Sequence, residues 1–281
     1  MRGLFVLLAC VVIFRVFFKQ TPFSRSARAT ASAPDANPPP DNASQPYLPQ
    51  GEEHSGIALD ILIDNSGSMK DRAGSDAQPK YVVAKAAIGR MLDATDSAVA
   101  RQPDVPVKVA MHTFSSDVSL VLPMQPYNRD SVRAALERIP TPNGSTAIGR
   151  AMSEARLELY RSGMLRKNLI VVTDGQNTTG PDPESVAHEI FDRSQGAVHM
   201  YFVAFDARAS LFSFLPSVKG AVLEARDGAT LGLALNDLYT NKVLAEAVDT
   251  TALTPRRAPD TNTVRRDPAA PMSPPTRKPF R

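Results

Sequence analysis

The sequence predicts an α/β fold: a doubly wound, mostly parallel open β-sheet with one antiparallel edge strand and helices on both faces. Apolar runs of strand length alternate along the chain with amphipathic helical segments, which is typical of strand–helix–strand units in a parallel sheet. Two of these apolar runs, at 107–114 and 118–122, are separated by three turn-forming residues. They therefore predict a hairpin, and with it one antiparallel pair of strands.

The strands are predicted from apolar runs bounded by turn residues. The first, at 57–63, reads Ile-Ala-Leu-Asp-Ile-Leu-Ile, a nearly continuous apolar run that suits a strand buried on both faces. The run Asn-Leu-Ile-Val-Val-Thr at 168–173 has the same character. A weak strand closes the sheet. In chain order the predicted strands are 57–63, 107–114, 118–122, 168–173, 198–205 and 221–224.

Helices are predicted in the connections between these strands. Pro79 precedes a segment of amphipathic period at 80–99, and proline is favoured near the first turn of a helix. Composition and period predict the other helices in the same way. They are 130–139, 146–162, 183–194, a short one at 211–216 and a closing helix at 231–248.

Charge and proline are unevenly distributed and set the predicted domain limits. The whole chain carries a net charge of +3, residues 1–50 carry +3 and residues 255–281 carry +5, so residues 51–254 carry −5. Of the 24 prolines, seven lie in each of the two flanks, which favours extended chain there. The acidic middle argues against a nucleic-acid partner. We predict a Pro/Ala/Ser-rich linker at 21–53, a folded domain at 54–250 and a disordered Pro/Arg-rich tail at 251–281.

The first twenty residues form a candidate membrane segment. An apolar run at 3–18 is broken by Arg15 and flanked by Arg2 and Lys19. It is short for a spanning helix, which needs about 20 apolar residues, and its length also suits a signal peptide. We expect a membrane anchor or signal segment at 1–20. The domain is then extracytoplasmic, periplasmic or at the cell surface, or secreted if the segment is cleaved. Basic residues after the run leave the orientation open.

Three clusters of oxygen-bearing side chains come where predicted strands end or a helix begins. Asp64, Ser66 and Ser68 follow the first strand, Thr146 opens a helix, and Asp174 follows a later buried strand. Ligands of open α/β sheets bind at the carboxyl ends of the strands, so these side chains are expected to meet. Hard divalent cations such as Mg²⁺ prefer oxygen ligands. A soft-metal site would need cysteines or clustered histidines, and the chain has one cysteine and four scattered histidines.

Each cluster also has a simpler structural interpretation. Serine and aspartate are common in turns and as helix caps, and a lone Asp-x-Ser-x-Ser is weak evidence for a metal. The order of the clusters favours a metal site, because all three lie at strand ends of one α/β pattern.

These residues resemble the metal-ion-dependent adhesion site of von Willebrand factor type A (vWA) domains, which have a Rossmann-like fold. The resemblance rests on Asp-x-Ser-x-Ser at 64–68, the threonine at 146 and Thr-Asp-Gly at 173–175, and it covers roughly 58–247. The segments Thr-Ala-Ile-Gly from 146 and Val-Val-Thr-Asp-Gly-Gln-Asn from 171 are similar to those of bacterial members.

The resemblance implies a ligand set and a partner. Ser66 and Ser68 are expected to bind one metal ion directly, Thr146 directly or through water, and Asp64 and Asp174 largely through water. The ion is expected to be Mg²⁺, or alternatively Mn²⁺ or Ca²⁺. Neutral hydroxyls leave most of the ion's charge uncompensated, so we expect it to attract an Asp or Glu side chain of a partner protein.

An enzyme is not expected. The histidines at 54, 112, 188 and 199 show no metal-ligand spacing, and His112 fits a partly buried strand position. No Gly-x-Ser-x-Gly elbow is present, and the best spare carboxylates for two-metal hydrolysis, Asp71 and Asp117, suit turns. The predicted function is a metal-dependent, adhesion-type protein-binding module at the membrane.

Two alternatives stay open. The first, implied by the vWA resemblance, is an adaptor or chaperone-like partner of an AAA+ ATPase. That ATPase must be a separate chain, because no ATP-binding Gly-rich loop occurs here. The second is a structural scaffold with a degenerate site, against which the intact set of motif residues argues.

Overall fold

The structure is a computed structural model that describes residues 53–245, apart from 102 and 104. The predicted membrane segment 1–20, residues 21–52 of the predicted linker and the predicted tail 251–281 lie outside the described residues. Within the described part of the chain, no helix has the length and apolar character needed to cross a membrane.

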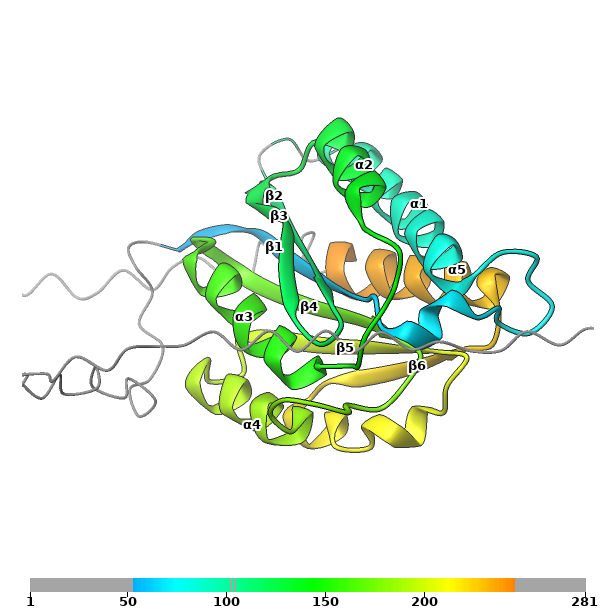
Figure 1. Ribbon diagram of the computed structural model, residues 1–281. Helices are drawn as coiled ribbons and strands as arrows, with labels where there is room; N and C mark the ends of the chain where they lie inside the picture. Colours follow the sequence, from blue (N-terminus) through cyan, green and yellow to red (C-terminus); the bar gives the residue numbers. More distant parts are fainter. Residues whose placement is uncertain (1–52, 102, 104, 246–281) are drawn as a thin grey trace, which may run out of the picture. The chain divides into compact units, whose positions relative to one another are not determined.

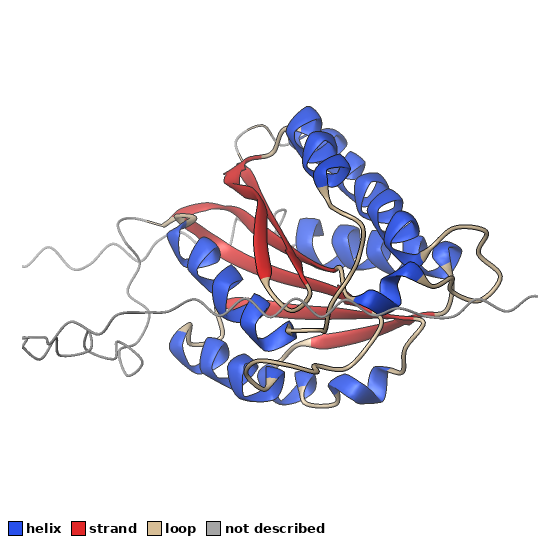
Figure 2. Ribbon diagram, viewed as in Figure 1, coloured by secondary structure: helices blue, strands red, loops and turns tan. Residues whose placement is uncertain are grey.

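A six-stranded sheet forms the centre of the domain, with the order β3-β2-β1-β4-β5-β6 (Figures 1 and 2). Neighbouring strands are parallel except for β2 and β3, which pair antiparallel at one edge. The predicted fold class is therefore confirmed. The strands are β1 (His54–Asp64), β2 (Val107–Phe114), β3 (Val118–Pro126), β4 (Met164–Thr173), β5 (Val198–Phe205) and β6 (Ala221–Ala225).

Helices cover both faces of the sheet (Figure 1). One face packs against α1 (Lys80–Arg101), α2 (Arg129–Arg138) and α5 (Gly228–Leu238), and the other against α3 (Ile148–Arg161) and α4 (Pro183–Arg193). Side chains of a strand alternate between faces, so odd-numbered apolar residues of β1 enter the first core and even-numbered ones the second. This double burial explains why β1 reads as a nearly continuous apolar run.

Two predicted helices differ in detail from the observed ones. The short helix expected at 211–216 is a pair of 3₁₀ helices, Ala209–Phe212 and Leu215–Val218, because Pro216 has no N–H to continue an α-helical ladder. The closing helix changes after α5 into a π-helical turn, Tyr239–Leu244. This turn accompanies the buried Tyr239, whose hydroxyl lies 2.5 Å from the Thr95 hydroxyl of α1.

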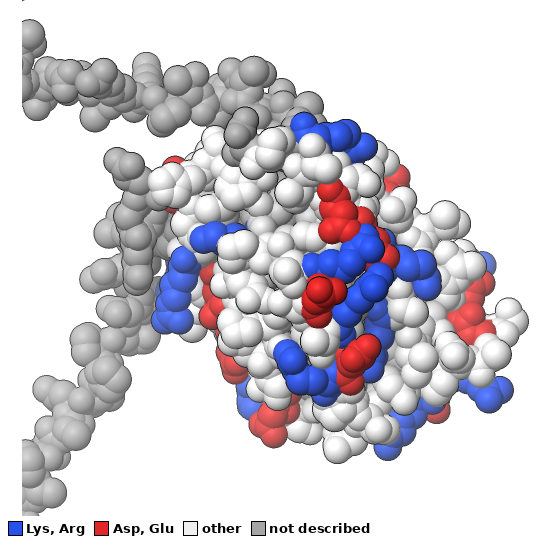
Figure 3. Space-filling model, turned by 90° about the horizontal axis from the view of Figure 1, so that it is seen from above, with Lys and Arg blue, Asp and Glu red and all other residues white. Residues whose placement is uncertain are grey.

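Basic and acidic side chains lie next to one another on the face of the domain seen in Figure 3. Ion pairs of this kind link α1 to α2: Arg129 pairs with Asp93 (3.4 Å) and with Asp96, and Arg133 pairs with Asp93 (3.6 Å). Charges of both signs at close range favour solubility over attraction of one kind of polyion.

Candidate metal-binding site

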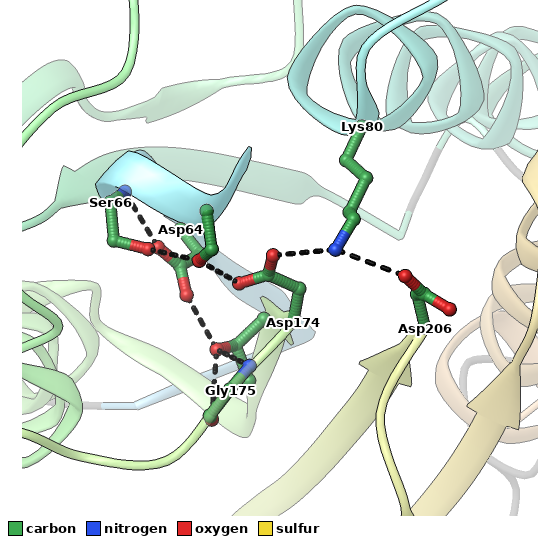
Figure 4. A network of polar contacts seen from close by, with 8 residues as sticks. Asp64, Ser66, Lys80, Asp174, Gly175 and Asp206 are labelled. Carbon is green, nitrogen blue, oxygen red and sulfur yellow. Dashed lines mark hydrogen bonds and ion pairs between the residues drawn. The ribbon is translucent and has the colours of Figure 1, made fainter. Parts of the chain in front are cut away.

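The candidate site lies at the carboxyl-terminal edge of three neighbouring strands (Figure 4). Asp64 is the last residue of β1, Asp174 directly follows β4 and Asp206 directly follows β5. Because parallel strands end at the same edge of a sheet, residues far apart in sequence meet here, as predicted for Asp64 and Asp174.

Asp64 is a buried carboxylate held by hydrogen bonds to both oxygens. Its Oδ1 accepts from the backbone N–H of Ser66 (2.8 Å), and its Oδ2 accepts from the hydroxyl of Thr173 (2.6 Å). Burial raises the pKa of Asp64 to about 6, although the hydrogen bonds from Thr173 and Ser66 act in the opposite direction. The side chain is therefore oriented before any ligand arrives, and its negative charge is only partly compensated by dipoles.

The two serines and Asp174 complete one connected network. The hydroxyls of Ser66 and Ser68 lie 3.2 Å apart, and the Ser68 hydroxyl donates to Asp174 Oδ1 (2.8 Å). Both serines lie where β1 leads into a 3₁₀ helix, Gly67–Lys70. Met69 of this helix is fully buried, so it anchors the loop beneath the serine hydroxyls.

Thr146 lies on a loop that is tied to the loop of the serines. The Gly67 N–H donates to the Gly144 carbonyl (3.0 Å), and the Thr146 N–H donates to the Thr178 hydroxyl (2.8 Å). Helix α3 begins at Ile148, so Thr146 precedes it instead of opening it as predicted. The Thr146 hydroxyl has no hydrogen-bond partner among the described residues and is not joined directly to the other four predicted ligands.

Two glycines allow these loops to approach one another. Gly144 has φ of +84°, a conformation that a side chain rarely adopts. A Cβ on Gly149, in the first turn of α3, would lie 2.2 Å from the Pro181 carbonyl oxygen. This contact places the start of α3 against the loop that follows Asp174.

The sequence prediction missed two charged residues of the network, Lys80 and Asp206. The Lys80 ammonium donates to Asp174 Oδ2 (3.0 Å) and also pairs with Asp206 Oδ2 (3.0 Å). Burial lowers the pKa of Lys80, but the hydrogen bonds to Asp174 and Asp206 outweigh burial and raise it. Asp206 follows a predicted strand directly, so the strand-end rule that found Asp64 and Asp174 also identifies it.

Other candidate residues lie outside the network. His112, predicted to be partly buried, is 2% exposed because it lies on the inner strand β2, and its ring pairs with the buried Asp60 on the neighbouring strand (Nδ1–Oδ1 3.0 Å). Asp71 ends the 3₁₀ helix of the serine loop, and Asp117 lies in the β2–β3 turn, where it pairs with Arg150 (3.4 Å). The Asp71 carbonyl accepts from the Lys80 N–H (2.8 Å), but neither carboxylate joins the hydrogen bonds of the site among the described residues.

The site offers oxygen atoms to a ligand. Among the described residues, no group of three or more His, Cys, Asp or Glu side chains is arranged to hold a metal. A cation at this edge would be bound by hydroxyl oxygens as well as by carboxylates. Among the described residues no group hydrogen-bonds the Thr146 hydroxyl, so its oxygen could serve as one of these ligands. Such a donor set is chemically suited to a hard divalent cation that keeps several waters.

Comparisons with known proteins agree with the fold. Residues 59–223 match the family model described as the von Willebrand factor type A domain, whereas no curated protein matches the chain. The structure is similar to BatB from Bacteroides thetaiotaomicron, a conserved hypothetical protein (21% identity, TM-score 0.53, 68% of this chain and 100% of that chain). It is also similar to an aerotolerance-related membrane protein from Bacteroides fragilis, solved with multiple mutations to serine (19%, TM-score 0.52, 68% and 100%).

The similarity extends to the VWA domain of SpRpn10, with 15% identity and a TM-score of 0.50 over 66% of this chain and 95% of that chain. These identities are low, so the solved structures support the fold, and the family match supports membership. The chain belongs to the von Willebrand factor type A domain family, whose domains mediate protein–protein interaction.

Proposed function

We propose that this chain is a metal-dependent protein-binding module that holds one divalent cation and uses it to grip an acidic side chain of a partner protein. The observation that carries the proposal is the hydrogen-bonded set of Asp64, Ser66, Ser68 and Asp174 at the carboxyl edge of the sheet. Thr146, whose hydroxyl has no hydrogen-bond partner within residues 53–245 as far as they are described, lies on the adjoining loop. Mg²⁺, or Mn²⁺ or Ca²⁺ in its place, is the expected ion.

The residues of the chain determine what a bound cation does here. The hydroxyls of Ser66, Ser68 and Thr146 carry no charge, and the carboxylates of Asp64 and Asp174 are engaged by hydrogen bonds from the protein. The cation would present a positive charge that the directly bound hydroxyls do not neutralise, and an Asp or Glu side chain could bind at its open coordination position. Affinity for the partner then depends on the metal, which makes the site a binding device rather than a source of activated water.

A non-enzymatic role is part of the proposal. The described residues include one Ser–His contact, between the Ser217 hydroxyl and His188 Nε2 (3.2 Å). It is exposed, the Ser217 hydroxyl donates to the Phe214 carbonyl (2.6 Å), and no carboxylate among the described residues hydrogen-bonds His188. A nucleophile needs a base that is itself oriented, and this pair lacks the orienting group.

Attachment to a membrane is also proposed, with the domain on the extracytoplasmic side. The support comes from the apolar run at 3–18 and from the Pro-rich segment that separates it from the domain. The similar protein from Bacteroides fragilis is a membrane protein, which agrees with such a tether. The segment itself lies outside the described residues.

The proposal is tested with an array of peptide pairs that differ by one Glu or Gln. The full-length chain and an Asp64→Ala/Ser66→Ala variant are each applied in Mg²⁺ and in EDTA. We expect the chain to select Glu over Gln peptides in Mg²⁺ alone, and the variant to lose this selection. Selection that persists in EDTA, or that is equal in the variant, would contradict the proposal.

A further inference from the structure

Lys80 is a buried cation inside the candidate site. It is the first residue of α1, and its side chain is 8% exposed. A helix N-terminus carries the positive end of the helix dipole, which disfavours a cation there. The first turns of α2 and α4 contain the acidic residues Asp130 and Glu184, whereas those of α1, α3 and α5 contain none, and α1 alone among these five helices begins with a lysine. Local helix preferences therefore do not account for Lys80.

Two carboxylates from different loops hold the Lys80 ammonium (Figure 4). Asp174, with a side chain that is 1% exposed, uses Oδ2 for Lys80 and Oδ1 for the Ser68 hydroxyl. Asp206 contacts Lys80 from the opposite side and is 39% exposed. The ammonium is thus separated from a predicted metal-binding hydroxyl by one carboxylate group.

The charged side chains of this network determine the net charge of the site with and without a metal ion. Asp64, Asp174 and Asp206 contribute three negative charges when ionised, and Lys80 contributes one positive charge. One divalent cation brings the set with Lys80 to neutrality. Without Lys80 the same loaded site would keep a net negative charge, which repels an acidic side chain.

We propose that Lys80 is a resident cation that sets the charge of the metal site, weakening metal binding so that the loaded site accepts an acidic partner. This inference rests on the proposed function and assigns the balance between metal and partner affinity to one residue. Asp206 has the opposite effect on metal binding, because its carboxylate adds one negative charge beside the Lys80 ammonium.

Titration of Mn²⁺ and Mg²⁺ into the full-length chain, followed by calorimetry, tests the inference with the metal alone. Lys80→Met removes the charge and keeps an apolar chain of similar length. We expect it to tighten metal binding on the order of tenfold, because a unit charge and a divalent ion a few ångströms apart interact appreciably even with water-like screening. Raising the salt concentration should reduce the difference.

Asp206→Asn supplies a second variant that does not depend on tolerance of an altered Lys80. Asp206 is partly exposed, and the Lys80–Asp174 pair stays in place, so the fold is expected to persist. Metal binding should weaken in this variant and return close to the original value when both substitutions are combined. Lys85→Met is the matched control, because Lys85 lies on the same helix over the Tyr81 ring (6.0 Å).

The outcomes separate this inference from the proposed function. Opposite shifts for Lys80→Met and Asp206→Asn, with no shift for Lys85→Met, support it. The inference is overturned if folded Lys80→Met binds metal equally or more weakly, or if Asp206→Asn binds it equally. These outcomes would leave the proposed metal-dependent function standing. Absence of metal binding by the unaltered chain overturns both.

Discussion

The hydroxyl of Thr173 holds the Asp64 carboxylate in its orientation. It donates to Asp64 Oδ2 (2.6 Å) and accepts from the Gly175 N–H (3.3 Å). Thr173 is fully buried at the end of β4, so water does not replace a missing hydrogen bond there. The orientation of the Asp64 carboxylate therefore depends on a residue that is not itself a predicted metal ligand.

Thr173→Val tests this support, because valine has nearly the same shape but lacks the hydroxyl. Leaving a buried carboxylate oxygen without its donor costs about 1–3 kcal/mol, so we expect a loss of stability of that size. Metal affinity should fall as well, since the Asp64 side chain loses its orientation. Urea unfolding in EDTA measures the first effect, and Thr173→Ser, which keeps the hydroxyl, is expected to lie much closer to the unaltered protein.

The pKa of Asp64 predicts how the metal-free protein responds to pH. An aspartate in the unfolded chain has a pKa of about 3.9, whereas burial raises that of Asp64 to about 6. The folded state therefore binds the proton more tightly than the unfolded state. As pH rises from about 4 to about 6, ionisation of Asp64 progressively lowers the free energy of unfolding. The total decrease is about 3 kcal/mol, and it stays constant at higher pH.

Asp64→Asn removes this titration and isolates its contribution. In EDTA, the difference in unfolding free energy between Asp64→Asn and the unaltered chain should shift in favour of the variant as pH rises from 4 to 6. Above pH 7 the difference should become constant. A difference that is independent of pH over this range would show that Asp64 has an ordinary pKa.

At the scale of elements, β3 is an edge strand with an irregular register, and side chains of neighbouring helices form hydrogen bonds with its backbone. Its register against β2 shifts near Ala110, and the Met124 N–H donates to Glu158 Oε2 of α3 (2.9 Å). Arg138 of α2 donates to the Val121 carbonyl (3.0 Å). These contacts occupy backbone groups that an edge strand would otherwise offer to another chain.

Glu158→Ala should leave the Met124 N–H unpaired and destabilise the domain by about 1 kcal/mol. We also expect increased self-association, measured by light scattering during size-exclusion chromatography at several protein concentrations. Glu158→Gln keeps an acceptor and is expected to remain close to the unaltered chain. Equal stability and equal mass for both variants would argue against a role of Glu158 at this edge.

Elements were more predictable from the sequence than the contacts between them. Apolar runs and the period of helices identified all six strands and the two faces of helices, because burial leaves a local pattern. The meeting of Asp64, Ser66, Ser68 and Asp174 was predictable because strand ends converge in a parallel sheet, whereas Thr146 lies on an adjoining loop without a direct hydrogen bond to them. Their role as metal ligands stays a prediction. The pairing of Lys80 with Asp174 was not predictable, since it joins residues 94 apart in sequence and opposes the preference of a helix start.

The buried Asp60–His112 pair shows the same limit. Each residue interrupts an apolar strand, and only the register of β1 against β2 brings them together. Burial raises the pKa of Asp60, whereas the hydrogen bond to Asp60 outweighs burial and raises that of His112. A single strand contains no signal for such a partnership, which arises from tertiary structure.

At the scale of the whole molecule, the fold places an oxygen-rich site at the carboxyl edge of the sheet and helices on both faces of that sheet (Figures 1 and 4). Charges of both signs lie close together on the face seen in Figure 3. That face therefore offers an acidic partner mixed charges rather than a broad basic surface. Metal-dependent binding of a partner requires first that this site bind a divalent cation.

Calorimetric titration of Mg²⁺ and Mn²⁺ into the full-length chain is the most direct test. It is performed beside Asp64→Ala/Ser66→Ala and a control, Asp71→Ala/Ser75→Ala, which alters exposed residues of the neighbouring loop. We predict saturable binding to one site in the unaltered chain and in the control, and its loss in the site variant. No saturable binding by the folded chain at millimolar metal, or equal binding by the site variant, would contradict a metal-dependent adhesion site.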